Sequence, residues 1–379
     1  MTSKERILAA FQRQPVDYVP CAPFMNCQAA VQRRGKRWQY PFGDSTVEAV
    51  DYMVGQMGTD YVLMFEWGFY PEPGVTSKVW MEGETIHKIW TTPSGELHAA
   101  VNYNDAWPHG LDIPLFSDYL PGHYAEPWVK SMRDVECLRH MLHPPRSKDA
   151  LELIRFRLRE TRRLADTYNL ATCFASGTGL NGAVHVFGPT AICELALTDP
   201  GLVDAYLELE HLLNLRNYEL AMDLGFDIIR RNGFYETCDL FSPALLEQFL
   251  FRRLQEEIRL VHAGGRLIGY IQLTGIMPLL DYLQRLEFDC LVCPDVFYHG
   301  MDAVKINAAL GAKKSFWTGP SDTLHMPWDK PEEVRQAVRY VFNVFGKTGL
   351  IITPCSSSKA VFPWSNVVAM IDEWKALRK

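Results

Sequence analysis

The chain has 379 residues, of which 47% are hydrophobic and 22% charged, so it has ample apolar material for a large folded core. A formal net charge of −7 argues against nucleic acid as the main partner. Nine irregularly spaced cysteines, and a start without the apolar core of a signal peptide, predict reduced thiols in a cytoplasmic protein. No apolar run approaches the roughly 18 residues of a membrane span, so no membrane partner is expected.

The first part of the chain predicts two buried strands and a long insertion. A short amphipathic helix is expected at residues 3–13, followed by a strand at residues 19–24. A helix at residues 46–57 precedes a second strand at residues 60–65. From about residue 68 to residue 145, alternating polar and apolar stretches are separated by Trp, Pro and Gly. This pattern predicts a β-rich insertion that is long enough to cap one end of a barrel.

Short apolar strands then alternate with helices as far as the C-terminus. A glycine-rich loop is expected at residues 176–189, followed by a helix through Leu197. Its spacing does not complete a dinucleotide-binding fingerprint, so it is interpreted as a tight turn or as a barrel loop that passes close to a ligand. The expected strands of this part are residues 171–175, 226–231, 266–271, 289–293, 314–318 and 350–353.

Eight short strands, buried on both faces and separated by helices, predict a parallel sheet of the α/β class. The simplest such fold is a (β/α)8 TIM barrel, and a doubly wound sheet is the alternative. The chain is therefore expected to form a single domain over residues 1–379, with the β-rich insertion at about 68–145.

Short segments along the whole chain carry a resemblance to a known family. They are the opening (residues 3–20), Gly188-Pro189, residues 240–243, residues 263–266, and the ending from Pro331 to Ile371. In this order they resemble the uroporphyrinogen decarboxylase superfamily. The fold that the resemblance implies is a (β/α)8 barrel, in agreement with the independent strand count.

Two features bear on the branch of that superfamily. Decarboxylases of the family carry arginines after the first strand that hold the substrate's carboxylates, whereas residues 24–30 here read FMNCQAA. Residues 90–97 and 128–138 are instead similar to segments of corrinoid-dependent methyltransferases and O-demethylases. The resemblance thus implies methyl transfer from a small, O-methylated aromatic ether to the cobalt of a corrinoid protein. The alternatives are a uroporphyrinogen decarboxylase-like decarboxylase, a catalytically inactive ligand- or partner-binding barrel, and a folate as methyl acceptor.

Methyltransferases of that branch commonly bind zinc through a His-x-Cys pair after the fifth strand and a Cys after the eighth. Cys355 matches the last position, but Tyr270 and Gln272 stand nearest to the places of the pair, and neither is a soft ligand. A zinc site could be rebuilt from residues at other strand ends. The expected ligands are then Glu236, Cys238, Cys293 and Cys355.

The expected chemistry also predicts which side chains contact the substrate. A methyl ether that loses its methyl group leaves an alkoxide or phenolate, so an acid or a hydrogen-bond donor is needed at the oxygen. The strand-end residues predicted as catalytic are Glu236, Asp322, Tyr270 and His325. The residues predicted to bind the substrate are Asn26, Trp67, Asn232, Tyr235, Gln272 and Tyr298. The expected partners are the small methylated substrate and the corrinoid protein, and the resemblance also allows a homodimer.

Overall fold

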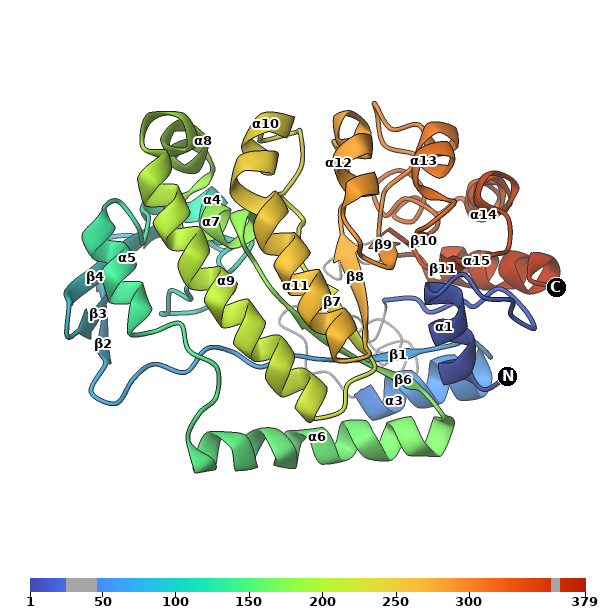
Figure 1. Ribbon diagram of the computed structural model, residues 1–379, viewed down its shortest axis with the longest axis horizontal. Helices are drawn as coiled ribbons and strands as arrows, with labels where there is room; N and C mark the ends of the chain where they lie inside the picture. Colours follow the sequence, from blue (N-terminus) through green and yellow to red (C-terminus); the bar gives the residue numbers. More distant parts are fainter. Residues whose placement is uncertain (25–45, 356–361) are drawn as a thin grey trace.

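The computed structural model describes residues 1–24, 46–355 and 362–379. A curled parallel sheet lies at its centre, in the order β1-β6-β7-β8-β9-β10-β11 (Figure 1). Each of these strands overlaps a strand predicted from the sequence. Their bounds are β1 (Val62–Phe65), β6 (Ala171–Ser176), β7 (Ile228–Arg231), β8 (Leu267–Ile271), β9 (Cys290–Val292), β10 (Ser315–Thr318) and β11 (Leu350–Ile352).

The first predicted strand, residues 19–24, lies beside β11 but does not form a regular strand. Cys21 makes an isolated parallel bridge with Ile352. The Ile352 N–H donates to the Pro20 carbonyl, and the Ala22 N–H donates to the Ile352 carbonyl, each over 2.9 Å. Because Pro20 has no N–H, it cannot continue a ladder as a donor. The segment nevertheless lies beside β11 where the remaining strand of the barrel was expected, and the predicted fold class is confirmed.

Helices surround the sheet, and α9 (Pro200–Asp223) and α11 (Arg252–Ala263) lie side by side, with α9 packed against β6 and α11 against β8 (Figure 1). The expected glycine-rich loop was partly wrong, because it contains α7 (Leu180–Phe187), whose eight residues are all buried. The remaining helices are α1 (Ser3–Phe11), α3 (Thr46–Val50), η1 (Asp51–Gln56), α6 (Lys148–Tyr168), α8 (Pro189–Thr198), α10 (Pro243–Leu246), η2 (Glu247–Phe251), η3 (Met277–Leu279), α12 (Leu280–Arg285), α13 (Ala303–Leu310), α14 (Pro331–Phe345) and α15 (Trp364–Leu377).

Taken singly, no helix in the described ranges has both the length and the apolar composition to span a membrane. Together, α7 and α8 pass that test, but they are bent by 113° with respect to each other.

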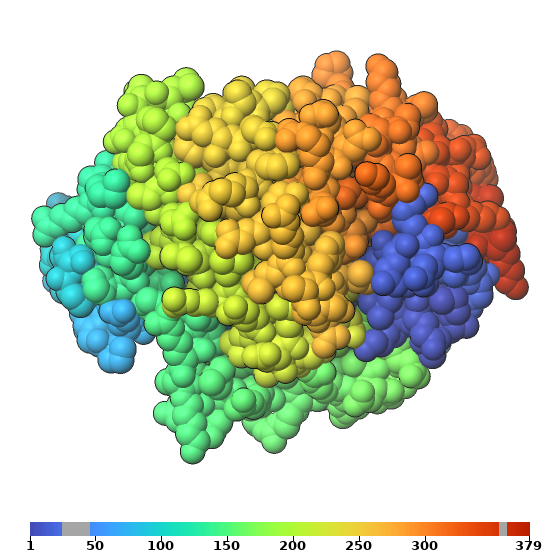
Figure 2. All heavy atoms as spheres, in the orientation of Figure 1, coloured from blue at the N-terminus to red at the C-terminus, as the bar shows by residue number. Residues whose placement is uncertain are grey.

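The insertion forms a separate antiparallel sheet at one end of the molecule, opposite the C-terminal helices (Figures 1 and 2). Its elements are β2 (Thr76–Glu82), β3 (Thr85–Thr92), β4 (Gly95–Asn102), α4 (Leu120–His123), β5 (Tyr124–Glu126) and α5 (Met132–Arg139). Hydrogen bonds join it to α7: for example, Val129 N–H donates to the Val186 carbonyl over 2.9 Å, and the Tyr124 hydroxyl donates to the His185 carbonyl over 2.5 Å. The insertion is therefore anchored on the barrel next to the carboxyl ends of the strands.

The central sheet separates two apolar layers. The lumen layer includes Ile228 of β7, whereas Ile229 belongs to the larger layer between the sheet and the helices. Because side chains alternate along a strand, Arg230 faces the lumen and Arg231 faces the helices. The contact between Arg231 and Glu257 of α11 confirms the second of these assignments. This alternation determines which predicted site residues can face a substrate.

Candidate functional site

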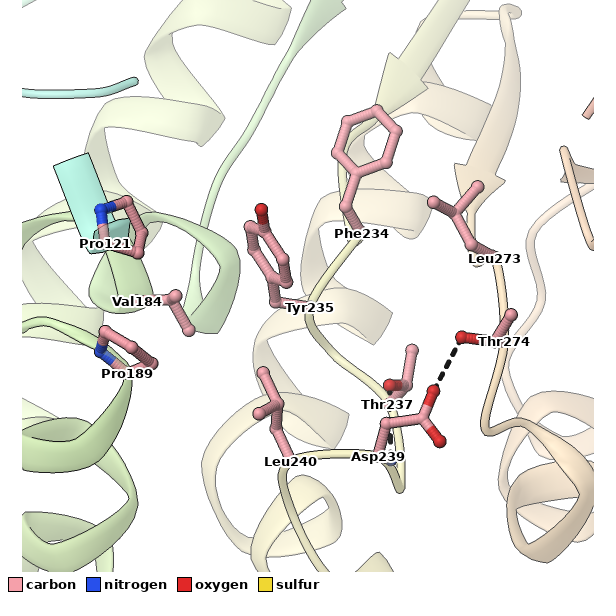
Figure 3. Close-up of a pocket in the computed structure, with 10 residues that line it drawn as sticks. All are labelled: Pro121, Val184, Pro189, Phe234, Tyr235, Thr237, Asp239, Leu240, Leu273 and Thr274. Carbon is pink, nitrogen blue, oxygen red and sulfur yellow. Dashed lines mark hydrogen bonds between the residues drawn. The ribbon is translucent and has the colours of Figure 1, made fainter. Parts of the chain in front are cut away.

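An open cleft of about 360 Å³ lies at the carboxyl ends of β7 and β8 (Figure 3). One wall comes from α4, α7 and the start of α8, and it faces the loops that follow β7 and β8. Active sites of barrel enzymes are built at this end of the strands, so the cleft is the candidate site. Its lining residues are Pro121, Val184, Pro189, Phe234, Tyr235, Thr237, Asp239, Leu240, Leu273 and Thr274.

Tyr235 is the predicted substrate contact that the structure places in this cleft. Its hydroxyl lies 3.4 Å from Asp118 Oδ1, which is long for a hydrogen bond between oxygens. His185 Nε2 lies 3.2 Å from the same carboxylate oxygen, and the His185 and Tyr235 rings meet edge to face. Burial, reinforced by the Asp118 charge, raises the pKa of Tyr235 to about 12. The phenol is therefore a hydrogen-bond donor at neutral pH.

Sequence reasoning missed Asp118 and His185. Asp118 belongs to the insertion, and His185 lies on α7 in a segment that was expected to be a loop. The sequence gives no spacing between Asp118 and Tyr235 that would predict their contact, because it depends on how the insertion packs against the barrel.

Glu236 and Tyr270, both predicted as catalytic, lie together but on the helix side of the sheet. The Tyr270 hydroxyl donates to Glu236 Oε2 over 2.5 Å, and Arg231 Nη2 lies 3.1 Å from Glu236 Oε1. Arg231 Nε also pairs with Glu257 Oε2 at 3.1 Å. We call Arg231, Glu236, Glu257 and Tyr270 the outer network. None of its side chains is more than 2% exposed, so in this placement Glu236 and Tyr270 do not face the open cleft.

The charges of the outer network shift the pKa of both carboxyl groups. Burial raises the pKa of Glu236, although the Arg231 guanidinium opposes this shift. Burial also acts on Glu257, but there the charges of Arg231 and His211 hold the pKa below its usual value. Arg231 therefore neutralises two carboxylates that have left water, which is the role of a structural ion network.

The outer network also explains the glycines of residues 177–182. Gly177 and Gly179 have φ of 84° and 55°, which favour glycine. A Cβ on Gly177 would lie 2.4 Å from Arg231 Cδ, and one on Gly179 would lie 2.6 Å from Glu236 Oε1. These glycines are therefore needed for a close approach to buried charged side chains.

Trp67 and Gln272, predicted to bind the substrate, are also packed inside the protein. The Trp67 ring stacks on Phe174 at 4.0 Å, and its indole N–H donates to Asn217 on α9. Trp67 therefore packs between the sheet and a helix and is not among the residues that line the cleft. Gln272 is fully buried and its amide donates to the Gly233 carbonyl over 3.3 Å. Asn26, which was also predicted to bind the substrate, lies outside the described residues.

The two other predicted catalytic residues, Asp322 and His325, lie in the loop that follows β10. Ser321 joins this loop to the end of β9, because its hydroxyl donates to Asp295 Oδ2 over 2.6 Å and its N–H donates to His325 Nδ1 over 3.1 Å. The Asp322 N–H donates to the Cys355 carbonyl over 3.1 Å. Burial lowers the pKa of His325, which favours the neutral imidazole. Tyr298, predicted to bind substrate, is 43% exposed on the neighbouring loop after β9.

The predicted zinc ligands are not brought together. Across residues 1–24, 46–355 and 362–379, no three His, Cys, Asp or Glu side chains are grouped so that they could hold a metal ion. Glu236 is engaged by Arg231 and Tyr270, and the Cys355 thiol donates to the Pro294 carbonyl over 3.0 Å. Cys238 is a half-buried thiol whose pKa is raised by burial to about 11, and Cys293 is buried with φ of 58°. The structure therefore does not bring Glu236, Cys238, Cys293 and Cys355 together as a ligand set.

Comparisons with known proteins agree with the fold. No family model matches the chain, and no curated protein matches its sequence. Among solved structures, a methyltransferase from Methanosarcina mazei matches over 99% of both chains, with a TM-score of 0.61 and 14% identity. A B12-independent methionine synthase from Shewanella sp. W3-18-1 matches over 58% of this chain and 64% of its own, with a TM-score of 0.43 and 10% identity. A D-allulose 3-epimerase from Methylomonas sp. matches over 56% of this chain and 78% of its own, with a TM-score of 0.37 and 16% identity. The chain thus shares its fold, insertion included, with a methyltransferase along the whole length of both proteins.

Proposed function

We propose that this chain is a methyltransferase that moves a methyl group from a small, O-methylated aromatic substrate to the cobalt of a corrinoid held by a partner protein. The observation that carries the proposal is the protonated Tyr235 hydroxyl in an apolar cleft of a barrel that shares its whole-length fold with a methyltransferase. Apolar walls suit an aromatic ether, because they bury its ring. The few polar groups in the cleft then fix the orientation of the substrate.

Tyr235 would supply what the leaving oxygen needs. When the methyl–oxygen bond breaks, its electron pair stays on the oxygen of the substrate, and a fixed donor stabilises the charge that develops there. The Tyr235 hydroxyl is held near Asp118 by a contact of only 3.4 Å, so a short movement transfers its hydrogen bond to the substrate. The pKa of about 12 keeps the proton on Tyr235 until that moment. His185 would position the Asp118 carboxylate, because its Nε2 lies 3.2 Å from the same Oδ1 that the Tyr235 hydroxyl contacts.

A corrinoid, when present on its own protein, supplies the nucleophile that accepts the methyl group. This chain then needs a site that the corrinoid can reach, and an apolar surface around it on which the partner protein can dock. The cleft is open to the surface, and three exposed apolar side chains lie on the loops that follow β9 and β10, at the same end of the barrel: Tyr298, Leu324 and Trp328. The proposed step does not use zinc, because the described residues do not group as metal ligands.

The experiment is a methyl-transfer assay with reduced corrinoid protein and a panel of methoxylated aromatic compounds, followed by the absorbance change of corrinoid methylation. We expect transfer with the parent chain and a loss of about 10²-fold in kcat for Tyr235→Phe, the size found for the removal of one oxyanion donor. Tyr103→Phe is the matched control, because Tyr103 is an exposed tyrosine of the insertion and is not among the cleft residues.

Two results would count against the proposal. A parent chain that transfers no methyl group from any compound, but is stabilised by some of them, would indicate a ligand-binding barrel without this activity. Full activity of Tyr235→Phe would remove Tyr235 as the donor while leaving methyl transfer in place.

A further inference from the structure

Arg230, which the sequence predictions did not include, extends into the barrel lumen. It follows Ile228 on the lumen face of β7, and its guanidinium carbon lies 5.6 Å from the centre of the Phe24 ring. The Phe24 ring in turn packs at 4.3 Å on Trp317, a member of the lumen layer. A positive charge is thus held among apolar side chains near the carboxyl end of the strand.

Arg230 is half-buried and lacks the partners that the buried arginines have. Within the part of the chain that the structure describes, it makes no ion pair, and its Nε is buried without a hydrogen-bond partner. By contrast, the well-buried arginines Arg6, Arg231 and Arg253 each pair with two carboxylates. Arg230 is half-buried, and its buried Nε is a donor that no described residue satisfies, so an anion from outside the chain could pair with it.

A second unsatisfied polar group lies next to Arg230. The Asn232 N–H donates to the Ser176 carbonyl over 3.1 Å, which continues the β6–β7 ladder by one residue. Asn232 therefore faces the same side of the sheet as Arg230. Its Oδ1 is buried and has no hydrogen-bond partner. Farther along the same loop, Phe234 packs against the lumen layer and also lines the cleft (Figure 3), so it lies between the lumen face of β7 and the cleft.

We propose that Arg230 and Asn232 bind the carboxylate of an aromatic acid, so that the substrate is an anionic rather than a neutral ether. The guanidinium fork matches the two oxygens of a carboxylate, and the Asn232 amide offers a further donor together with an acceptor for a ring hydroxyl. Phe24 and Phe234 supply aromatic faces for the ring of the acid. The identification of this acid as a methyl donor rests on the proposed function, whereas the binding of its carboxylate does not.

The test measures binding to the full-length chain by titration calorimetry, without corrinoid. The probes are 4-methoxybenzoate and its neutral isostere 4-methoxybenzamide. We expect the acid to bind at least about 10-fold more tightly than the amide, because a charge-assisted bidentate pair is stronger than a neutral hydrogen bond. Arg230→Met should weaken the acid about 10- to 100-fold, to the level of the amide, without changing the affinity for the amide. Arg230→Lys should keep part of the preference, since it keeps the charge but loses the fork.

Arg259→Met is the control for the change in net charge, because Arg259 is a 71% exposed arginine on the outer helix α11. It should bind both probes as the parent does. The inference is overturned if 4-methoxybenzoate does not bind, if acid and amide bind equally, or if Arg230→Met binds the acid as tightly as the parent. Arg230-dependent binding without any methyl transfer would uphold this site and count against the proposed function. Methyl transfer from neutral ethers alone would support the proposed function and count against the carboxylate site.

Discussion

Arg230 and Arg231 are neighbours in the sequence, yet they lie on opposite faces of β7 in different surroundings. Arg231 faces the helices and is enclosed by Glu236 and Glu257, with both contacts at 3.1 Å. Arg230 faces the lumen, where Phe24 supplies a ring rather than a charge. On the helix side the protein neutralises its own buried charge, and on the lumen side, among the residues described, it does not.

This difference separates stability from binding along one strand. A buried ion network contributes little net stability compared with apolar packing, but the loss of one member leaves a charge stranded away from water. Arg230 in the lumen has the opposite property, because its removal leaves no described carboxylate without a partner, and an added anion would pair with it. The two faces can therefore be told apart by measuring unfolding and binding on the same pair of substitutions.

The largest effect is expected for Arg231→Met. It leaves Glu236 and Glu257 buried without a cation, so the free energy of unfolding should fall by about 3–5 kcal/mol in urea titrations at pH 7. Glu236→Gln is the matched control and should cost less, since Arg231 keeps Glu257 as its partner. A stability of Arg231→Met equal to that of the parent would show that the outer network does not support the fold.

A smaller effect is expected from Glu210, which lies on α9 close to the outer network. Its Oε1 accepts hydrogen bonds from Thr178 and Tyr206, whereas Oε2 is buried without a partner. Burial raises the pKa of Glu210 to about 7, from the usual 4.5. The folded state therefore holds this proton more tightly than the unfolded state, so the stabilisation is complete below about pH 4.5 and is lost as the pH rises through 7.

That shift corresponds to about 3 kcal/mol between pH 4.5 and pH 8. Urea titrations over this range should show a shallower decline for Glu210→Gln, because the amide resembles the protonated acid at every pH. Glu219→Gln is the control, since Glu219 is exposed on the same helix, and it should keep the slope of the parent. Equal slopes in all three proteins would assign the pH dependence to other groups.

The sequence was sufficient for most of the barrel because its strands are short apolar runs that are buried on both faces. Leu350–Ile352 of β11 is such a run, and the structure places it where the pattern predicts. The failure at α7 has a physical cause. The glycines in this segment were interpreted as a loop signal, but a Cβ at their positions would clash with Arg231, Glu236 or Glu210. This steric requirement does not prevent a helix from beginning at Leu180.

The candidate site was less predictable, because the position of a residue at a strand end does not determine whether its side chain points into the lumen or toward the helices. Glu236 and Tyr270 do come after or within barrel strands, as expected, but they point toward the helices. The alternation Ile228, Ile229, Arg230, Arg231 does contain a signal for the lumen arginine, since Arg230 shares the face of Ile228. The contact of Asp118 with Tyr235 has no such signal, because it arises from the docking of an insertion onto the barrel.

The smallest change in stability is expected for Arg230→Met. No carboxylate among the described residues loses its partner, and Met occupies an apolar site well, so the free energy of unfolding should stay within about 1 kcal/mol of the parent value. The same variant should lose the stabilisation that 4-methoxybenzoate gives the parent, which is about 2.7 kcal/mol at 100 times the dissociation constant. If Arg230→Met instead loses as much stability as Arg231→Met, the lumen arginine is part of the fold, and the contrast between the two faces of β7 fails.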